Sequence, residues 1–353
     1  MAIIIISDLV DYHAAAVAWA LAATGVPYVQ WEGIGYEEPR QASIELGSYT
    51  RVRLGGHLVS KNDVIWFRRP RQLSYHPDMA VLDRRFAMLE SLRFSECLGA
   101  ALDEIGCRCV NSPTAVYDIN RKAAQIILAH KVGLLVPHTL MGNQPPEIED
   151  FFRSVENDAV YKAFLPHLWF DPDTESQAIL ETKNISSLAN DVIEVATYTP
   201  GIYQKRVRKV ADIRVLVMGE LMRAFVLHSE ALDWRYTQDY ADLKIKERAI
   251  PAPIRSLIEQ FMSAAGIVTG SLDFGLDEHG QWWFFEINES GQFLWIDHSM
   301  EGAGVFQDFL AFLSGKPREL FPCLKDYRHD DSILDSRPKE MAPIVTVEHL
   351  GVC

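Results

Sequence analysis

Several features that would assign this chain to a specialised class are scarce or missing. Its 353 residues include only 5 cysteines, without the paired spacing of a zinc site, which favours reduced thiols and predicts a cytoplasmic location. Basic residues are not in surplus, since 34 Lys and Arg face 48 Asp and Glu and the formal net charge is −14. This balance argues against a nucleic-acid partner. No apolar run is long enough to span a bilayer, so no membrane partner is expected.

The two commonest nucleotide-binding motifs are also missing. The sequence contains neither G-x-x-x-x-G-K-[ST] nor G-x-G-x-x-G, which argues against a P-loop or a Rossmann dinucleotide site. Its first apolar run, Ile3–Ile6, is short, follows no basic leader and is soon ended by Asp8. We expect a buried strand there rather than a signal peptide.

The pattern of the remaining residues predicts an α+β protein with several units. A strand at Ile3–Ile6, a helix at His13–Thr24 and a second strand in VPYVQW open an α/β domain over residues 1–113. A helix at Tyr117–Val132 and an apolar strand at Ala159–Leu165 place a central lobe at 114–203. Paired strands around a Gly219-Glu220 turn and around the turn DEHG place a third unit at 204–324. A charged tail covers 325–353.

The hairpin around DEHG carries three oxygen-bearing side chains. If WWFFEIN is extended, alternation puts Phe284, Glu286 and Asn288 on one face and Ile287 on the other. Asp273 lies on the partner strand, near the open end of the hairpin. Two carboxylates and an amide that converge in this way suit Mg²⁺, which is usually completed by water and substrate phosphates. The alternative is an exposed strand face with ordinary polar residues.

Two lysines extend this pattern. Lys162 interrupts the apolar strand AVYKAFL, and Lys122 lies near a helix start. A lone lysine in such a strand more often extends its ammonium from the strand edge into water than binds a ligand. Two lysines together with a magnesium site favour a nucleoside triphosphate, because both kinds of cation neutralise phosphate oxygens.

The combination resembles the ATP-grasp superfamily, in which two α+β lobes hold ATP between them. The resemblance assigns the magnesium to Asp273 and to the E-x-N pair Glu286 and Asn288, and the phosphates to Lys122 and Lys162. It assigns the nucleotide to the lobe-linking strand YQKRV and to the D-I-R motif after it, through Gln204, Lys205, Arg206, Val207 and Asp212. Lys205 departs from the pattern, because many members carry an acid at that position.

Within the superfamily, the chain is similar to the graspetide, or microviridin-type, peptide-crosslinking ligases. The likeness rests on five segments: WFRRP at Trp66–Pro70, VNSP at Val110–Pro113, DIRVLVMG at Asp212–Gly219, DWR at Asp233–Arg235 and FEINESGQFLWID at Phe285–Asp297. It covers about residues 1–315. It implies an ATP-grasp fold preceded by an N-terminal α/β domain, and a homodimer.

The activity that the resemblance implies is an ATP- and Mg²⁺-dependent ligation. An Asp or Glu side chain of a ribosomal precursor peptide, made as leader and core, is activated as an acyl phosphate. A Thr, Ser or Lys side chain of the same peptide then forms an ester or amide, with ADP and phosphate released. Arg214 and Arg235 are the candidates for holding the carboxylate and acyl phosphate, since a guanidinium binds both groups bidentately. Two alternatives remain open: a ligase of free amino acids or small acids, and a non-catalytic nucleotide-binding protein of the same fold.

Overall fold

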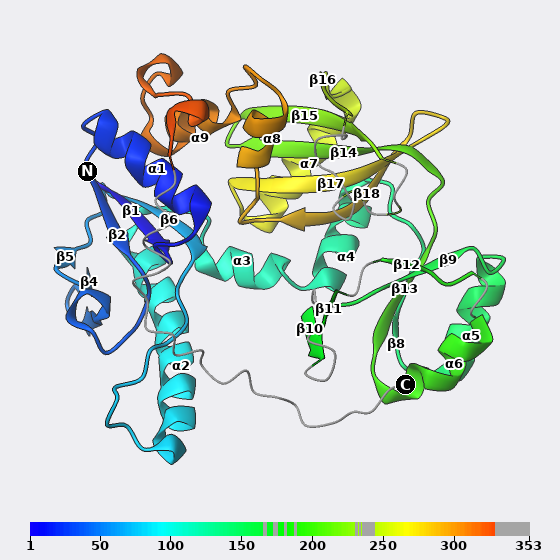
Figure 1. Ribbon diagram of the computed structural model, residues 1–353, viewed down its shortest axis with the longest axis horizontal. Coiled ribbons are helices and arrows are strands. Elements are labelled where there is room, and N and C mark those ends of the chain that lie inside the picture. Colours follow the sequence, from blue (N-terminus) through cyan, green and yellow to red (C-terminus); the bar gives the residue numbers. More distant parts are fainter. Residues whose placement is uncertain are drawn as a thin grey trace.

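The computed structural model of this chain describes residues 1–164, 168–171, 176–179, 182–186, 189–229, 232, 234 and 244–328, to which every structural statement below refers. In Figure 1 the N-terminal unit and a four-stranded central sheet lie at opposite ends of the molecule, with a five-stranded sheet between them. This mixture of helices and sheets confirms the predicted α+β class.

The N-terminal unit is built on a parallel sheet of order β2-β1-β6-β7. Its elements are β1 Ile3–Ser7, α1 Tyr12–Ala23, β2 Tyr28–Trp31, β6 Val64–Arg69, α2 Val81–Ile105 and β7 Arg108–Val110. The isoleucine run of β1 is buried along its length, as expected where both faces of a parallel strand are covered. A small antiparallel sheet adds β3 Ala42–Leu46, β4 Thr50–Leu54 and β5 His57–Leu58.

The single helix predicted at Tyr117–Val132 is wrong, because the structure has two helices there. The helix α3 spans Pro113–Ile119 and α4 spans Lys122–Val132. Between them Arg121 is extended, with φ −71° and ψ 115° in the range of a strand, which interrupts the helical hydrogen bonds. As a result, Lys122 is the first residue of a separate helix that packs against the five-stranded sheet.

The central sheet is antiparallel, with strand order β12-β9-β13-β8. Its elements and flanking helices are β8 Thr139–Gly142, α5 Pro145–Ser154, β9 Ala159–Lys162, β12 Lys183–Asn184, α6 Ala189–Val195 and β13 Gly201–Lys205. A hairpin of β10 Leu168–Asp171 and β11 Ser176–Ile179 follows β9 in the chain. The strand β13 leads from this sheet directly into the last one, which begins at Lys209.

The five-stranded sheet is antiparallel, in the order β16-β15-β14-β17-β18. Its elements are β14 Lys209–Met218, β15 Leu221–His228, β16 Lys244–Arg248, α7 Ala252–Ala265, β17 Thr269–Asp277 and β18 Trp282–Asn288, followed by α8 Leu294–Ser299 and α9 Val305–Ser314. The predicted DEHG turn joins β17 to β18, and Gly280 has the positive φ of 77° that such a turn needs.

Two apolar cores hold the units together. One lies between the sheet and the helices α4 and α7, where Ile258 and Phe261 meet Phe274 and Phe284. The other joins α1 and the parallel sheet to α8, α9 and the far ends of β14 and β15. No helix in the described part of the chain is both long and apolar enough to cross a membrane.

Candidate functional site

Three of the predicted site residues lie side by side on adjacent strands. Arg214 on β14 pairs in register with Asp273 on β17, which pairs with Glu286 on β18. Cross-strand neighbours in an antiparallel sheet have Cβ atoms about 4.5–5.5 Å apart. We call Arg214, Asp273 and Glu286 the charged row. Asn288 lies two residues beyond Glu286 and pairs with Ser271.

The predicted alternation along β18 is wrong at its centre. The register shifts between Asp273 and Phe274, so that Phe285 is an extra residue opposite the junction. Phe284 is therefore buried on the same face as Ile287, in the core beneath the sheet. The bulge reverses the alternation and turns Glu286 and Asn288 to the opposite face from Phe284.

The charged row contains a buried ion pair. Nη1 of Arg214 lies 2.6 Å from Oδ1 and 2.7 Å from Oδ2 of Asp273. Both side chains are buried, with exposures of 4% and 11%. Nε of Arg214 is also buried, and within the described part of the chain it has no hydrogen-bond partner. Removing either side chain would deprive the other buried charge of this partner and would lower the free energy of unfolding.

Glu286 and the residue after it are held by two side chains of α4. Nζ of Lys122, at the start of α4, lies 2.5 Å from its Oε2. The next residue, Ile287, exchanges two backbone hydrogen bonds with the buried side chain of Gln125: Oε1 accepts from its N–H at 3.0 Å, and Nε2 donates to its carbonyl at 3.1 Å. Since β18 is an edge strand, Gln125 takes the place of a further strand and fixes the position of Glu286.

The second predicted lysine reaches the same strand from the central sheet. Lys162 is the last residue of β9, and its Nζ lies 4.8 Å from the centre of the Phe285 ring. The bulged residue therefore provides an aromatic face for this ammonium. Lys122 on α4 and Lys162 on β9, 40 residues apart in sequence, thus both contact β18 at the charged row or next to it.

The residues predicted to bind the nucleotide lie along the stretch from Gln204, near the end of β13, to Asp212, in β14, which we call the linker. Gln204 is buried and donates to Oγ1 of Thr139 at 2.9 Å, while Lys205 is exposed. Nε of Arg206 lies 2.5 Å from Oδ1 of Asp158, and the carbonyl of Val207 accepts from the N–H of Lys209 at 2.9 Å. The structure therefore brings these residues to one connection between the two sheets.

Three salt bridges lie along that connection. Besides Arg206, Arg208 contacts Asp158, with Nε and Nη2 both 3.2 Å from Oδ2. Burial disfavours the ionised form of Asp158, but its hydrogen bond and ion pair with Arg206 outweigh this and lower its pKa below the usual 3.8. Asp212 lies 2.5 and 2.6 Å from Nζ of Lys209. Arg206 and Asp212 are thus both engaged with protein groups.

The remaining predicted site residue, Arg235, lies outside the described residues, as does the end of the chain from 329. Its neighbour Trp234 is described, and its ring centre lies 5.9 Å from the Arg214 guanidinium. Arg235 therefore stays a prediction from sequence.

The donor set fits a hard cation. Asp273, Glu286 and Asn288 supply carboxylate and amide oxygens, which is the chemistry that Mg²⁺ prefers. Arg214 pairs with Asp273 and Lys122 pairs with Glu286. Both carboxylates are therefore already in contact with positive charge, which a metal ion would also supply. In the described ranges no three or more His, Cys, Asp and Glu side chains cluster in a way suited to a metal, and the donors proposed here are two carboxylates and an amide.

A pocket of about 500 Å³ opens beside this site. Its walls include Asn120 and Arg121, next to Lys122, and Glu289 and Ser290, next to Asn288. Arg121 and Glu289 directly adjoin Lys122 and Asn288 in the chain, and neighbouring Cα atoms are about 3.8 Å apart. The pocket therefore lies next to the predicted site. Its other lining residues come from the N-terminal unit and α3: Phe67, Arg68, Pro70, Asn111, Pro113, Val116 and Tyr117.

Sequence reasoning missed the groups that support the site. Gln125 was not recognised because it contacts the backbone of Ile287, and Ser271 because it only lies opposite Asn288. Neither residue is part of a charged sequence pattern. Asn111 and Arg68 lie in the VNSP and WFRRP segments, so a signal was present without a role attached. His13 gave no signal, since the N–H groups that it binds belong to Phe293 and Leu294, 280 and 281 positions away.

No protein-family model matches this chain, and no curated protein matches it. Solved structures do. A RiPP-associated ATP-grasp ligase of Chryseobacterium gregarium, in complex with ADP and a leader and core peptide, has a TM-score of 0.75 at 20% identity, covering 91% of this chain and 99% of that one.

Two further structures agree. The macrocyclase MdnC of Microcystis aeruginosa MRC, bound with the precursor peptide MdnA, has a TM-score of 0.71 at 20% identity and covers 90% and 100% of the two chains. The ATP-grasp ligase PsnB, complexed with a phosphomimetic variant of its minimal precursor, Mg and ADP, has a TM-score of 0.65 at 21% identity and covers 88% and 97%. With the whole length of these ligases matched, the chain has the ATP-grasp fold.

Proposed function

We propose that this chain is an ATP-dependent ligase that crosslinks a ribosomally made precursor peptide in the cytoplasm. The observation that carries the proposal is the charged row with Asn288 beside it, approached by one lysine from α4 and another from the central sheet. The fold adds support, because similar structures include peptide ligases that hold ADP and precursor peptides.

The described residues divide the work of binding a nucleotide and its metal. Asp273, Glu286 and Asn288 would hold Mg²⁺, which when bound compensates the charge of the triphosphate. Lys122 and Lys162 would neutralise phosphate oxygens from the two sides of β18. The linker from Gln204 to Asp212, which joins the two sheets, would lie against the nucleotide base and ribose.

The first chemical step joins the peptide to phosphate. A carboxylate oxygen of an Asp or Glu side chain attacks the γ-phosphorus of ATP, and the bond from that phosphorus to the bridging oxygen breaks to release ADP. Because carboxylate and triphosphate repel each other, cations must hold them together. Arg214 is suited to this, since its guanidinium is already fixed by Asp273 and its buried Nε lacks a partner among the described residues.

The second step closes the ring. A hydroxyl or amine of the same peptide attacks the acyl carbon and loses its proton, and the carbon–oxygen bond to phosphate breaks. The peptide loses one water for each linkage. The pocket beside Asn288 offers the peptide a place next to the reacting groups, and its mixed lining of Phe67, Tyr117, Asn120 and Arg121 suits a polypeptide segment. Arg235 is assigned to the peptide side of the reaction.

The test uses the full chain and a short peptide encoded next to its gene, rich in Thr or Ser and Asp or Glu. With ATP and Mg²⁺, mass spectrometry should show loss of one water per linkage, and hydroxylamine should trap the acyl phosphate as a hydroxamate. Asp273→Asn and Glu286→Gln should abolish both, while Arg235→Ala should mainly raise the KM for peptide. ADP release with small amines and no peptide would instead indicate a ligase of free amino acids. No ATP turnover with any substrate would indicate a non-catalytic nucleotide-binding protein.

A further inference from the structure

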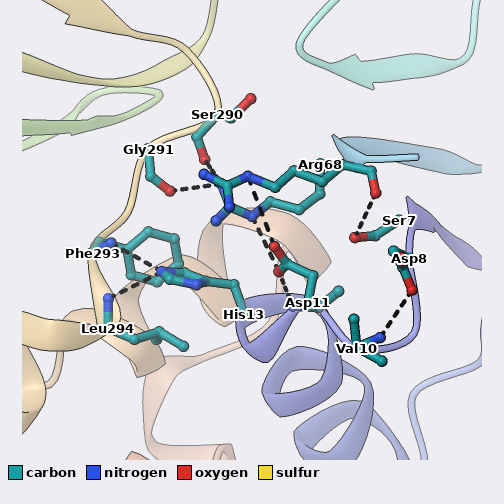
Figure 2. Close-up of polar contacts among 12 residues, drawn as sticks. Ser7, Asp8, Val10, Asp11, His13, Arg68, Ser290, Gly291, Phe293 and Leu294 are labelled. Carbon is teal, nitrogen blue, oxygen red and sulfur yellow. Dashed lines mark hydrogen bonds and ion pairs between the residues drawn. The ribbon is translucent and has the colours of Figure 1, made fainter. Parts of the chain in front are cut away.

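The segment that follows Asn288 is held along its backbone by side chains of the N-terminal unit. Five of the six residues from 289 to 294 take part. Asn111 donates to the carbonyl of Glu289 at 3.2 Å, Arg68 donates to the next two carbonyls, and His13 accepts from the last two N–H groups. Figure 2 shows Arg68 and His13 meeting this segment from the side of α1 and β6. We call Asn111, Arg68 and His13 the N-terminal clamp.

Arg68 is the central member of the clamp. Its Nη1 lies 2.6 Å from the carbonyl oxygen of Ser290 and 3.0 Å from that of Gly291, and its Nε lies 3.3 Å from Oδ1 of Asp11. The same Asp11 oxygen caps α1 by accepting from the N–H of Ala14 at 2.9 Å. A buried guanidinium thus connects the first turn of α1 to the segment after β18.

His13 completes the clamp as an acceptor. Its Nε2 lies 3.2 Å from the backbone nitrogen of Phe293 and 3.4 Å from that of Leu294. Both are N–H donors, so this nitrogen must carry a lone pair. Burial, and then the neighbouring Arg68, lower the pKa of His13 from 6.5 to about 3, which keeps the imidazole neutral.

The backbone of the clamped segment passes close to the residue opposite Asn288. Gly291 has a φ of 44°, and a Cβ at this position would come within 2.9 Å of Oγ of Ser271. Ser271 is the cross-strand partner of Asn288, and its side chain is buried. Asn111 also binds the start of β17, accepting from the N–H groups of Val268 and Thr269 at 2.8 and 3.0 Å. The clamp therefore bears on both strands at the end where Asn288 lies.

We propose that His13, Arg68 and Asn111 are positioning residues that set Asn288 for metal binding, so that the N-terminal unit completes a site whose ligands all come from another unit. The inference rests on the proposed function, because it concerns the magnesium of that site. Groups that orient metal ligands from behind typically change metal affinity by about 10- to 100-fold when they are altered.

The experiment measures ADP binding by calorimetry as a function of Mg²⁺ concentration, with thermal unfolding recorded for each variant. Arg68→Lys keeps the charge but loses the planar fork that reaches two carbonyls and Asp11. The matched control is Arg108→Lys, because Arg108 also crosses from the N-terminal unit and donates to two carbonyls, those of Phe312 and Leu313, at 2.9 and 3.2 Å. Arg68→Lys should raise the Mg²⁺ midpoint at least about tenfold and leave ADP binding without metal unchanged. Arg108→Lys should leave the midpoint unchanged.

A second pair of variants tests the acceptor. His13→Gln places an amide oxygen where Nε2 lies and should retain the wild-type Mg²⁺ midpoint, whereas His13→Leu should raise it. Equal midpoints for all four variants, or an equal rise for Arg68→Lys and Arg108→Lys, would overturn the proposal. If Arg68→Lys does not fold, the two His13 variants decide. A wild-type protein whose ADP binding ignores Mg²⁺ would instead refute the proposed function itself.

Discussion

Acidification should destabilise this protein through a single histidine. The imidazole of His13 is enclosed between α1 and the segment after β18, and its pKa is lowered to about 3, first by burial and then by Arg68. In the unfolded chain the pKa of histidine is about 6.5. Between these values the unfolded chain binds a proton that the folded protein does not, so stability rises with pH. The contribution is constant above pH 6.5 and is lost progressively as pH falls from 6.5 towards 3.

The size of the loss follows from the two pKa values. One pKa unit is equivalent to 1.36 kcal/mol, and pH 5 lies about 1.5 units below the unfolded pKa. The free energy of unfolding should therefore fall by about 2 kcal/mol between pH 7 and pH 5 on account of His13 alone. The neighbours Arg68, Arg69 and His298 act against its protonation, and Asp11 acts for it.

Urea unfolding at pH 7 and pH 5 measures this loss by comparison with His13→Gln, which keeps an acceptor but does not titrate. The variant should be less sensitive to acid than the wild type by about 2 kcal/mol. His279→Gln is the control, because that side chain is 75% exposed and should leave the acid sensitivity of the wild type intact. If the wild type and His13→Gln lose the same stability, the imidazole titrates freely in the folded protein and the clamp geometry is wrong.

Two other predictions concern the charged row. Arg214→Met should lower the free energy of unfolding by about 3–5 kcal/mol, because it leaves Asp273 buried without its cation. Arg153→Met, which removes an exposed pair, should cost far less, and equal losses in urea unfolding would contradict the argument. Lys122→Met should weaken ATP binding but strengthen the binding of Mg²⁺ alone, because the ammonium 2.5 Å from Glu286 no longer competes with the metal. Calorimetry that shows both affinities falling together would refute this competition.

The local parts of the site could be predicted from the amino-acid sequence alone. Asp273 and Glu286 are separated by one short hairpin, and the DEHG turn that joins their strands is encoded by neighbouring residues. Cross-strand pairing within a hairpin depends mainly on its own turn, so the convergence of the two acids could be predicted. The isoleucine strand and the alanine-rich helix after it were also predictable, because each is encoded by a pattern of neighbouring residues.

Tertiary packing decided the rest. The bulge at Phe285, which reverses the faces of β18, accommodates a ring over Gly275 and next to Lys162, and nothing in WWFFEIN marks it. The break before Lys122 separates α3, which packs on α2 and α7, from α4, which packs on α7 and β18. His13 and Arg68 contact residues that are 280 and 222 positions away in the chain. Side chains that satisfy the backbone of a distant segment follow no periodic pattern, so only the folded arrangement of the units shows what they hold.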